Sequence, residues 1–320
     1  MTSTKTNNIE KLPVTALQGN RAGLTKEERK LRRRHFWYRG AKKANRSRAV
    51  DILLAIFLLL LGAFMILPIW FAVVNAFKPI EEILIFPPRL YVAHPTLNNF
   101  VQLSQILENM WVPFSRYLFN SVLVTVLATG GNVICASLAA YPLAKHNFPG
   151  KKVISKIIVM ALLFTTQVLY IPQYIISAKL HLINTYWSLI FPVVQMTMGL
   201  YLMQQFMGQI PSSLLEAARI DGAGEFRIWW KIVMPSVKPA WLTVIIFAFQ
   251  NIWNNNGNLY IYNESMKVLP SIMSQVQAGG LARTGATSAV ILVMMLPPII
   301  LFTATQRQVI ETMTTSGIKE

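Results

Sequence analysis

The 320-residue sequence predicts an all-α integral membrane protein with six transmembrane helices, on three observations. Hydrophobic residues make up 53% of the chain. Charged residues make up only 13%, whereas a soluble domain contains about 25%. Six apolar segments contain no Lys, Arg, Asp or Glu, and the charged residues lie in the stretches between them. This pattern is typical of membrane spans separated by charged loops.

The predicted spans are residues 52–77, 117–144, 157–178, 186–207, 239–253 and 284–305. Most of them reach the length of about 20 residues that a helix needs to cross the hydrocarbon core. The fifth is the weakest, because Gln250 and Asn251 interrupt it. It is included because the loops then follow the positive-inside rule. With a cytoplasmic N-terminus, 24 of the 30 Lys and Arg residues fall in cytoplasmic segments. The sequence thus predicts a multi-pass protein whose N-terminus is cytoplasmic.

These spans divide the chain into four predicted parts. They are a basic cytoplasmic tail (1–49), the first transmembrane helix with an external loop (50–116), a core of five spans (117–310) and a C-terminal tail (311–320). Most of the net charge of +17 lies in the first 50 residues. A basic segment just before a first span typically sits on anionic lipid. We therefore expect the tail to contact membrane lipid and not nucleic acid.

The external loop contains a predicted amphipathic helix. Residues 96–99 can begin a helix, and Phe100, Leu103, Ile106 and Met110 then fall near one face. Such a helix would lie against the outer membrane surface or a partner chain, or would cover the ends of the spans.

Between the fourth and fifth spans, residues 212–235 predict two short helices. Ser213 is a suitable N-cap for the first, and Glu216 follows three residues later, which together form a capping box. Asp221 and Gly222 are expected to end this helix, because glycine adopts a positive φ without strain.

The second helix of this loop is predicted to be amphipathic. Phe226, Trp229, Trp230 and Val233 recur at i, i+3, i+4 and i+7, which predicts one apolar face along the membrane boundary. Pro235 marks the turn into the fifth span, and a second proline follows at position 239.

The loop also carries a spaced pattern: Glu216-Ala217-Ala218, then Gly222, Ile232 and Pro235. It resembles the EAA loop of permease subunits in binding-protein-dependent ABC importers, with Met234 in place of the usual Leu. The resemblance implies a type I ABC importer permease fold and a loop that docks into a cytosolic ATPase. It implies an ATPase-coupling role for Ser213, Glu216, Ala217, Ala218, Asp221, Gly222, Gly224 and Pro235.

The resemblance also implies a location and partners. We expect a bacterial inner membrane protein that assembles with a second homologous permease, a dimer of cytosolic ABC ATPases and an external solute-binding protein. The sequence contains no Gly-x-x-x-x-Gly-Lys-Ser/Thr pattern for nucleotide phosphates. We therefore expect a non-catalytic subunit with no cofactor or metal of its own, and expect ATP and Mg to be bound by the partner ATPase.

Further features resemble the carbohydrate group of these importers, in particular the smaller permease of the maltose type. They are the loop sequence EAARIDGAGEF (216–226), the Pro-Thr-Leu-Asn-Asn-Phe segment (95–100) after the first span, and the pair Trp253-Asn254 at the end of the fifth span. This resemblance implies that the substrate is a sugar, specifically an oligosaccharide.

The composition of the spans is compatible with a sugar, because neutral sugars bind amides, hydroxyls and aromatic faces and require no intramembrane charge. Amides cluster at the end of the fifth span, where Gln250, Trp253, Asn254 and Gly257 would share a helical face. Such amides can line a pathway or bond neighbouring helices. The pathway candidates are Gln250, Asn251, Trp253, Asn254 and Asn256. Two other functions remain open: import of another solute, such as a peptide or amino acid, and a receptor or scaffold role without transport.

Overall fold

The computed structural model describes residues 48–108 and 110–316, and each regular element in this part of the chain is helical. Positions 1–47 of the predicted basic tail and residues 317–320 of the C-terminal tail lie outside the described residues. The elements are α2 (Arg48–Ala76), α3 (Ile80–Ile83), α4 (Asn98–Glu108), α5 (Phe114–Lys145), α6 (Lys151–Ala161), α7 (Thr166–Lys179), α8 (Trp187–Val194), α9 (Thr197–Gly208), α10 (Ser212–Ile220), α11 (Glu225–Ile228), η2 (Trp229–Val233), α12 (Met234–Ser236), α13 (Lys238–Trp253), η3 (Glu264–Met266), α14 (Leu269–Gln277), η4 (Gly280–Arg283) and α15 (Thr284–Ser316).

Two compact units divide the chain, with the boundary between Leu67 and Pro68. The described part of the first unit is residues 48–67 of α2. Its large apolar side chains are exposed, Leu53 and Leu59 among them. From Ile52 onward this part of α2 carries no charged side chain, and a long apolar helix with exposed side chains suits a lipid environment.

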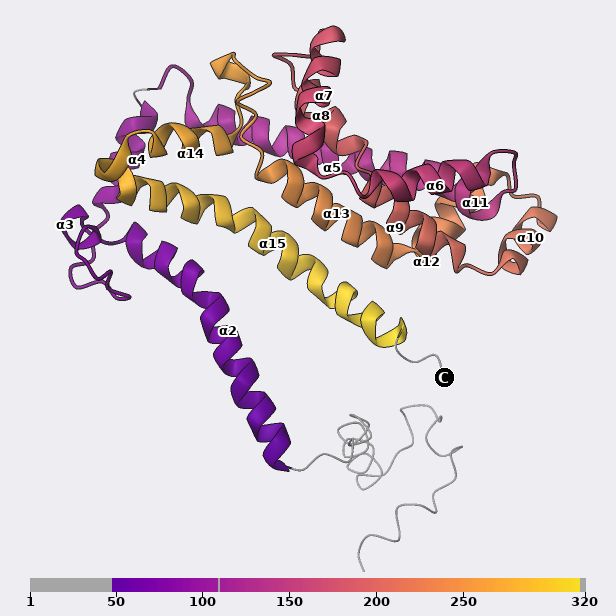
Figure 1. Cartoon of the computed structure of the whole chain (residues 1–320), viewed down its shortest axis with the longest axis horizontal. Helices are drawn as coiled ribbons and strands as arrows, with labels where there is room; N and C mark the ends of the chain where they lie inside the picture. The colour runs from indigo at the N-terminus through magenta and orange to yellow at the C-terminus, as the bar shows by residue number, and fades with distance from the viewer. Residues whose placement is uncertain (1–47, 109, 317–320) are drawn as a thin grey trace, which may run out of the picture. The chain divides into compact units, whose positions relative to one another are not determined.

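The second unit is organised around α5, which packs against α8, α9 and α13. These helices lie side by side in Figure 1, with α5 in magenta. Small side chains allow the close approach: Ala128, Ala136 and Ala140 of α5 are buried. The core of this unit is therefore built on α5, which contacts α8 and α9 before the coupling loop and α13 after it.

Among the described residues, three helices are long and apolar enough to cross a membrane: Val50–Ala76, Phe114–Lys145 and Gly280–Gln306. A fourth is added if the helices Glu225–Ser236 and Lys238–Trp253, bent by 81°, form one span. The predicted third and fourth spans are each divided, the third into α6 and α7 and the fourth into α8 and α9. The all-helical prediction is confirmed for the described residues, but the count of six uninterrupted spans is not.

The break between α8 and α9 is held by a residue of α5. The buried side-chain amide of Asn132 donates hydrogen bonds to the carbonyls of Val193 (2.9 Å) and Val194 (3.0 Å). A Cβ at Gly199 would lie 2.6 Å from Oδ1 of Asn132. Glycine at this position therefore leaves room for the Asn132 side chain, which bonds carbonyls at the end of α8. The carbonyl of Val193 also accepts from the N–H of Met196 (3.0 Å).

The predicted amphipathic helix after the first span is confirmed as α4. Leu103 is buried, and Phe100, Ile106 and Met110 pack against the same cluster of α5, α13, α14 and α15 side chains. Asn99 fixes the start of the helix, because its side-chain amide donates hydrogen bonds to the backbone carbonyls of Ala76 (3.0 Å) and Lys78 (2.7 Å).

Glu82, on α3, is a buried carboxylate in the segment between α2 and α4. It accepts hydrogen bonds from the backbone N–H groups of Ala93 (2.8 Å) and His94 (3.4 Å). The bond from Ala93 holds the pKa of Glu82 below its usual value of 4.5, against the opposing effect of burial. Glu82 therefore joins α3 to the chain at residues 93 and 94 by hydrogen bonds.

The N-terminal end of α5 is hydrogen-bonded to the segment that follows α13. Tyr117 donates a 2.5 Å hydrogen bond to Glu264. Asn120 donates to the carbonyls of Ser265 (2.9 Å) and Lys267 (2.8 Å). The region between α13 and α14 is thus bonded to α5 through buried side chains.

Candidate functional site

Residues 208–238 contain the loop predicted at 212–235, and we call this whole segment the coupling loop; its first helix is α10. Its N-terminus differs from the predicted capping box. The helix starts at Ser212, with Pro211 as the N-cap and no side-chain cap hydrogen bond. The prediction that Ser213 caps it and pairs with Glu216 is wrong. Pro211 sets φ near −60° just ahead of the helix, which therefore begins two residues earlier than predicted and without a side-chain acceptor.

The C-terminus of α10 agrees with the prediction. The helix ends at Ile220, and Gly222 adopts φ +78°. The N–H of Ala223 bonds the carbonyl of Ala218, and the N–H of Gly222 bonds that of Arg219, both at 3.0 Å. This pair of bonds is a Schellman motif, which requires the left-handed conformation that glycine adopts most easily.

α10 presents one face to the protein and another to solvent. Leu215 and Ala218 are buried against the core. Glu216 and Ala217 are exposed, and Ile220 is 86% exposed. Phe226, on α11, is also 71% exposed. The loop therefore carries large apolar side chains on a surface that the described chain does not cover.

The second helix of the loop differs from the prediction. It runs through α11, the π-helix η2 and α12. Trp229 and Val233 are buried, whereas Phe226 and Trp230 are exposed, so the four residues predicted to form one apolar face do not share it. The prediction assumed 3.6 residues per turn, whereas the π-helix that begins at Trp229 contains more residues per turn, so Trp230 and Val233 fall on different faces. The helix then meets α13 at the 81° bend that the prolines at 235 and 239 predict.

A cluster of polar side chains joins the coupling loop to the end of α5. Glu225 accepts hydrogen bonds from Arg219 (2.8 Å) and from the hydroxyl of Tyr141 (2.5 Å). His146 lies 3.4 Å from the same carboxylate. The bond to Glu225 raises the pKa of Arg219. Sequence reasoning missed this cluster, because Tyr141 and Glu225 are 84 residues apart and no local pattern relates them.

The same turn of α5 contacts the start of the coupling loop. The Lys145 ammonium donates hydrogen bonds to the carbonyls of Gly208 (3.0 Å) and Ile210. Both are at the end of α9, where helix carbonyls have no further helical donors. A lysine at this position therefore satisfies carbonyls and complements the negative end of the helix dipole.

The structure separates the predicted pathway residues. Gln250 and Asn251 are exposed on α13 and line a shallow hollow with Phe247 and the methionines at 196 and 198. Trp253 is buried: its indole N–H donates to the carbonyl of Met294 (3.0 Å) on α15, and its ring stacks on that of Phe249.

The last pathway candidates lie past the helix. Asn254 caps the end of α13, and its amide donates to the carbonyl of Gln250 (2.9 Å). Asn256 is exposed and accepts from the N–H of Asn258 (3.2 Å). The helix ends before Gly257, which adopts φ +67°, so the predicted shared face that included it does not form.

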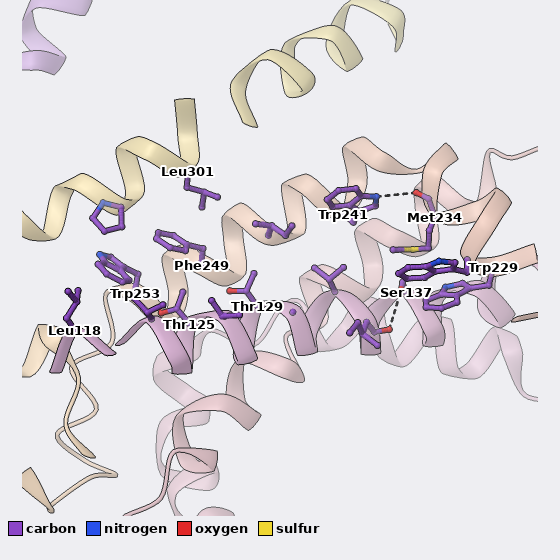
Figure 2. Close-up of a pocket in the computed structure, with 18 residues that line it drawn as sticks. Leu118, Thr125, Thr129, Ser137, Trp229, Met234, Trp241, Phe249, Trp253 and Leu301 are labelled. Atoms are coloured by element: carbon purple, nitrogen blue, oxygen red, sulfur yellow. Dashed lines mark hydrogen bonds between the residues drawn. The ribbon is translucent and has the colours of Figure 1, made fainter. Parts of the chain in front are cut away.

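An apolar groove of about 620 Å³ runs along α5, α13 and α15. Figure 2 shows Thr125 and Thr129 of α5 with Phe249 and Trp253 of α13 beside them, and Leu301 of α15 across the groove. Trp241 and Met234 are joined there by a 3.2 Å hydrogen bond. Trp253 lines this groove, whereas none of the amides predicted for the pathway does. The tryptophan therefore faces a different part of the structure from the other pathway candidates.

The described residues contain no group of three or more His, Cys, Asp or Glu side chains that could hold a metal ion. The coupling loop has exposed apolar side chains and an exposed carboxylate at position 216, and hydrogen bonds join it to α5.

Comparison with known proteins shows the family of this chain. Residues 132–314, more than half of the chain, match the binding-protein-dependent transport system inner membrane component family. The chain belongs to this family. The matched segment of the permease contains the coupling loop, α13 and most of α15.

Two relatives and one structure illustrate the likeness. The permease is 26% identical to the arabinooligosaccharides transport system permease protein AraQ of Bacillus subtilis, over 84% of this chain and 95% of that protein. It is 30% identical to the polygalacturonan/rhamnogalacturonan transport system permease protein YtcP of the same organism, over 69% and 76%. A chain in the crystal structure of a bacterial ABC transporter involved in the import of the acidic polysaccharide alginate has a TM-score of 0.70 and 21% identity, over 83% of this chain and 99% of that one. The permease therefore has the type I importer permease fold.

Proposed function

We propose that this permease forms half of the translocation pathway of an ATP-driven oligosaccharide importer and that its coupling loop docks into a cytosolic ATPase. The observation that carries the proposal is the geometry of α10. The helix buries Leu215 and Ala218 and exposes Glu216, Ala217 and Ile220. Exposed apolar side chains grouped on one surface are typical of a protein interface.

The loop is suited to transmit force because it is held at its ends and ordered by its own backbone. Gly222 closes α10 with a Schellman motif, and Glu225 bonds the loop to α5. In this proposal Ser213, Glu216, Ala217, Ala218, Asp221 and Gly224 form or shape the docking surface, and Pro235 directs the chain into α13. A rigid surface helix loses little conformational entropy on binding, which favours tight docking.

We further propose six crossings with a cytoplasmic N-terminus. Three helices are long enough to span, and the bent pair that ends in α13 would make a fourth crossing. The divided pairs α6–α7 and α8–α9 would each make one interrupted crossing. Interrupted backbone is tolerated in a membrane where protein satisfies its polar groups, and Asn132 does this for α8.

A sugar substrate is supported by the names of the similar permeases, which refer to arabinooligosaccharides and to polygalacturonan or rhamnogalacturonan. The exposed amides Gln250, Asn251, Asn254 and Asn256 offer donors and acceptors for sugar hydroxyls near the end of α13. ATP and Mg would be bound by the ATPase dimer, and a second permease and an external solute-binding protein would complete the importer.

The experiment is uptake in proteoliposomes that contain the permease with its second permease and ATPase, supplied with the solute-binding protein. A panel of labelled arabino-oligosaccharides, oligogalacturonides, maltotriose and a tripeptide is compared with and without ATP. We expect ATP-dependent uptake of at least one saccharide and none of the tripeptide. Uptake of the tripeptide alone would refute the sugar assignment. Absence of uptake, with an ATPase that the binding protein does not stimulate, would favour a receptor or scaffold.

A further inference from the structure

The last turn of α5 contacts the coupling loop on both sides of α10. Before α10, Lys145 donates to the carbonyls of Gly208 (3.0 Å) and Ile210. After α10, the Tyr141 hydroxyl donates to the carboxylate of Glu225 (2.5 Å). Two side chains that lie one helical turn apart therefore hold the two ends of the helix that is proposed to dock.

Glu225 is the residue at which these connections meet. Its Oε1 accepts from Arg219 of α10 (2.8 Å), and its Oε2 accepts from Tyr141 of α5 (2.5 Å). Hydrogen bonds to an ionised group are roughly twice as strong as those between neutral groups. One carboxylate thus links α10, α11 and α5.

The alternative route from α10 to the core follows the chain itself. It passes through the π-helix η2 and then the 81° bend before α13. A π-helix and a bend are sites at which a helix can deform. A displacement of α10 could therefore be absorbed along this route, whereas α5 is one continuous helix that packs on α8, α9 and α13.

We propose that Tyr141, Lys145 and Glu225 are positioning residues that clamp the coupling loop onto α5, so that movement of α10 by the ATPase displaces α5 and the helices packed on it. This proposal rests on the proposed function. The clamp touches neither nucleotide nor solute, and its effect is on how much transport each hydrolysed ATP produces.

The test uses Tyr141→Phe, which removes one hydroxyl, and Glu225→Gln, which removes the charge at constant size. The double variant and a control, Tyr201→Phe, complete the set. Tyr201 lies on α9, is half-buried, and forms no side-chain hydrogen bond to any residue in the described part of the chain. ATP hydrolysis and uptake are measured in the same proteoliposomes, with the saccharide of the panel above that the wild type takes up fastest.

We expect each single variant to lower the amount of saccharide transported per ATP at least fivefold, while hydrolysis stays within twofold of the wild type. Both variants act on the Tyr141–Glu225 hydrogen bond, one by removing the donor and the other by removing the charge on the acceptor. The double variant should therefore be no worse than the more damaging single one. The control should match the wild type. An unchanged ratio in the single variants, or losses that multiply in the double variant, would overturn the clamp.

A second measurement separates this proposal from the proposed function. If the wild type itself neither hydrolyses ATP nor transports, the importer assignment fails, and the clamp is tested by hydrogen exchange of the full chain in detergent. Tyr141→Phe should increase amide exchange in residues 212–225 at least fivefold, and Tyr201→Phe should not. Equal exchange in the two variants would show that Tyr141 does not hold the loop.

Discussion

The side-chain amide of Asn132 donates a 2.9 Å hydrogen bond to the backbone carbonyl of Val193, so that a residue of α5 closes the end of α8. The same amide reaches the carbonyl of Val194. Both bonds lie inside the second unit of the chain, where an unbonded carbonyl is costly. The break in the predicted fourth span is thus a stable feature that depends on a distant side chain.

Replacing Asn132 with Leu should therefore destabilise the permease. The substitution removes the Asn132 donor from the carbonyls of Val193 and Val194, of which Val193 keeps the N–H of Met196 (3.0 Å). A carbonyl left without a donor costs about 1–3 kcal/mol where it is buried. The check is the thermal unfolding midpoint of the purified chain in detergent, with Asn251→Leu as control, since Asn251 is exposed. We expect a clear drop for Asn132→Leu only. Equal midpoints would mean that the carbonyls find other donors.

Replacing Gly222 with Ala should weaken ATPase binding without a steric clash. Its φ is +78°, and no atom lies within 4 Å of an added Cβ, so the effect is conformational. The left-handed region costs an L-residue about 1–2 kcal/mol, equivalent to roughly a fivefold or larger loss of affinity. Binding of the purified ATPase to the permease in nanodiscs measures it.

The matched control for this substitution is Gly208→Ala. Gly208 is helical and likewise has no atom within 4 Å of an added Cβ, but its φ is not positive. It should bind the ATPase as the wild type does. If both substitutions have the same effect, the left-handed turn is not what the loop requires.

Features set by local chemistry were predictable from the sequence. The Asp221-Gly222 stop of α10 and the apolar face of α4 depend on residues a few positions apart, and both are confirmed. The break between α8 and α9 involves Asn132, which bonds a residue 61 positions away. The contact between α5 and the coupling loop involves Tyr141, which bonds a residue 84 positions away. No periodicity in the sequence reveals contacts at such separations. The π-helix places Trp230 and Val233 on different faces, because from Trp229 onward it alters the period that the prediction assumed.

The stability of the segment between α2 and α4 should depend on pH in the acid range, because of Glu82. Its pKa in the folded protein is held below 4.5 by the N–H of Ala93. The carboxylate therefore stabilises the fold at pH values above 4.5, and this contribution is lost as the pH falls through the lowered pKa of the folded state.

The check is the unfolding midpoint between pH 7 and pH 3 for the wild type and for Glu82→Gln. The variant should start lower at pH 7 and lose less on acidification, because it has no proton to gain at this site. Glu81→Gln, at an exposed neighbouring position, should follow the wild type. Parallel curves for Glu82→Gln and the wild type would exclude this carboxylate as a source of acid sensitivity.

The exposed apolar side chains of the coupling loop should matter for binding and not for folding. Ile220→Ser and Phe226→Ser change side chains that are mostly solvent-exposed, so stability should stay within about 0.5 kcal/mol. If these side chains anchor the ATPase, each substitution should cost more than about 1 kcal/mol of binding. Leu163→Ser, at an exposed site outside the loop, is the control. Unaltered ATPase binding by both loop variants would remove them from the interface.

The most direct test of the coupling loop is to find out what touches Ala217 in the membrane. A photoreactive cysteine label is placed there by Ala217→Cys in a Cys135→Ser background, because Cys135 is the one cysteine in the sequence. On illumination of membranes that contain the complete importer, we predict a cross-link to the cytosolic ATPase, which is lost in Gly222→Pro. A label at position 217 that reacts only with lipid or with the external solute-binding protein would contradict the account.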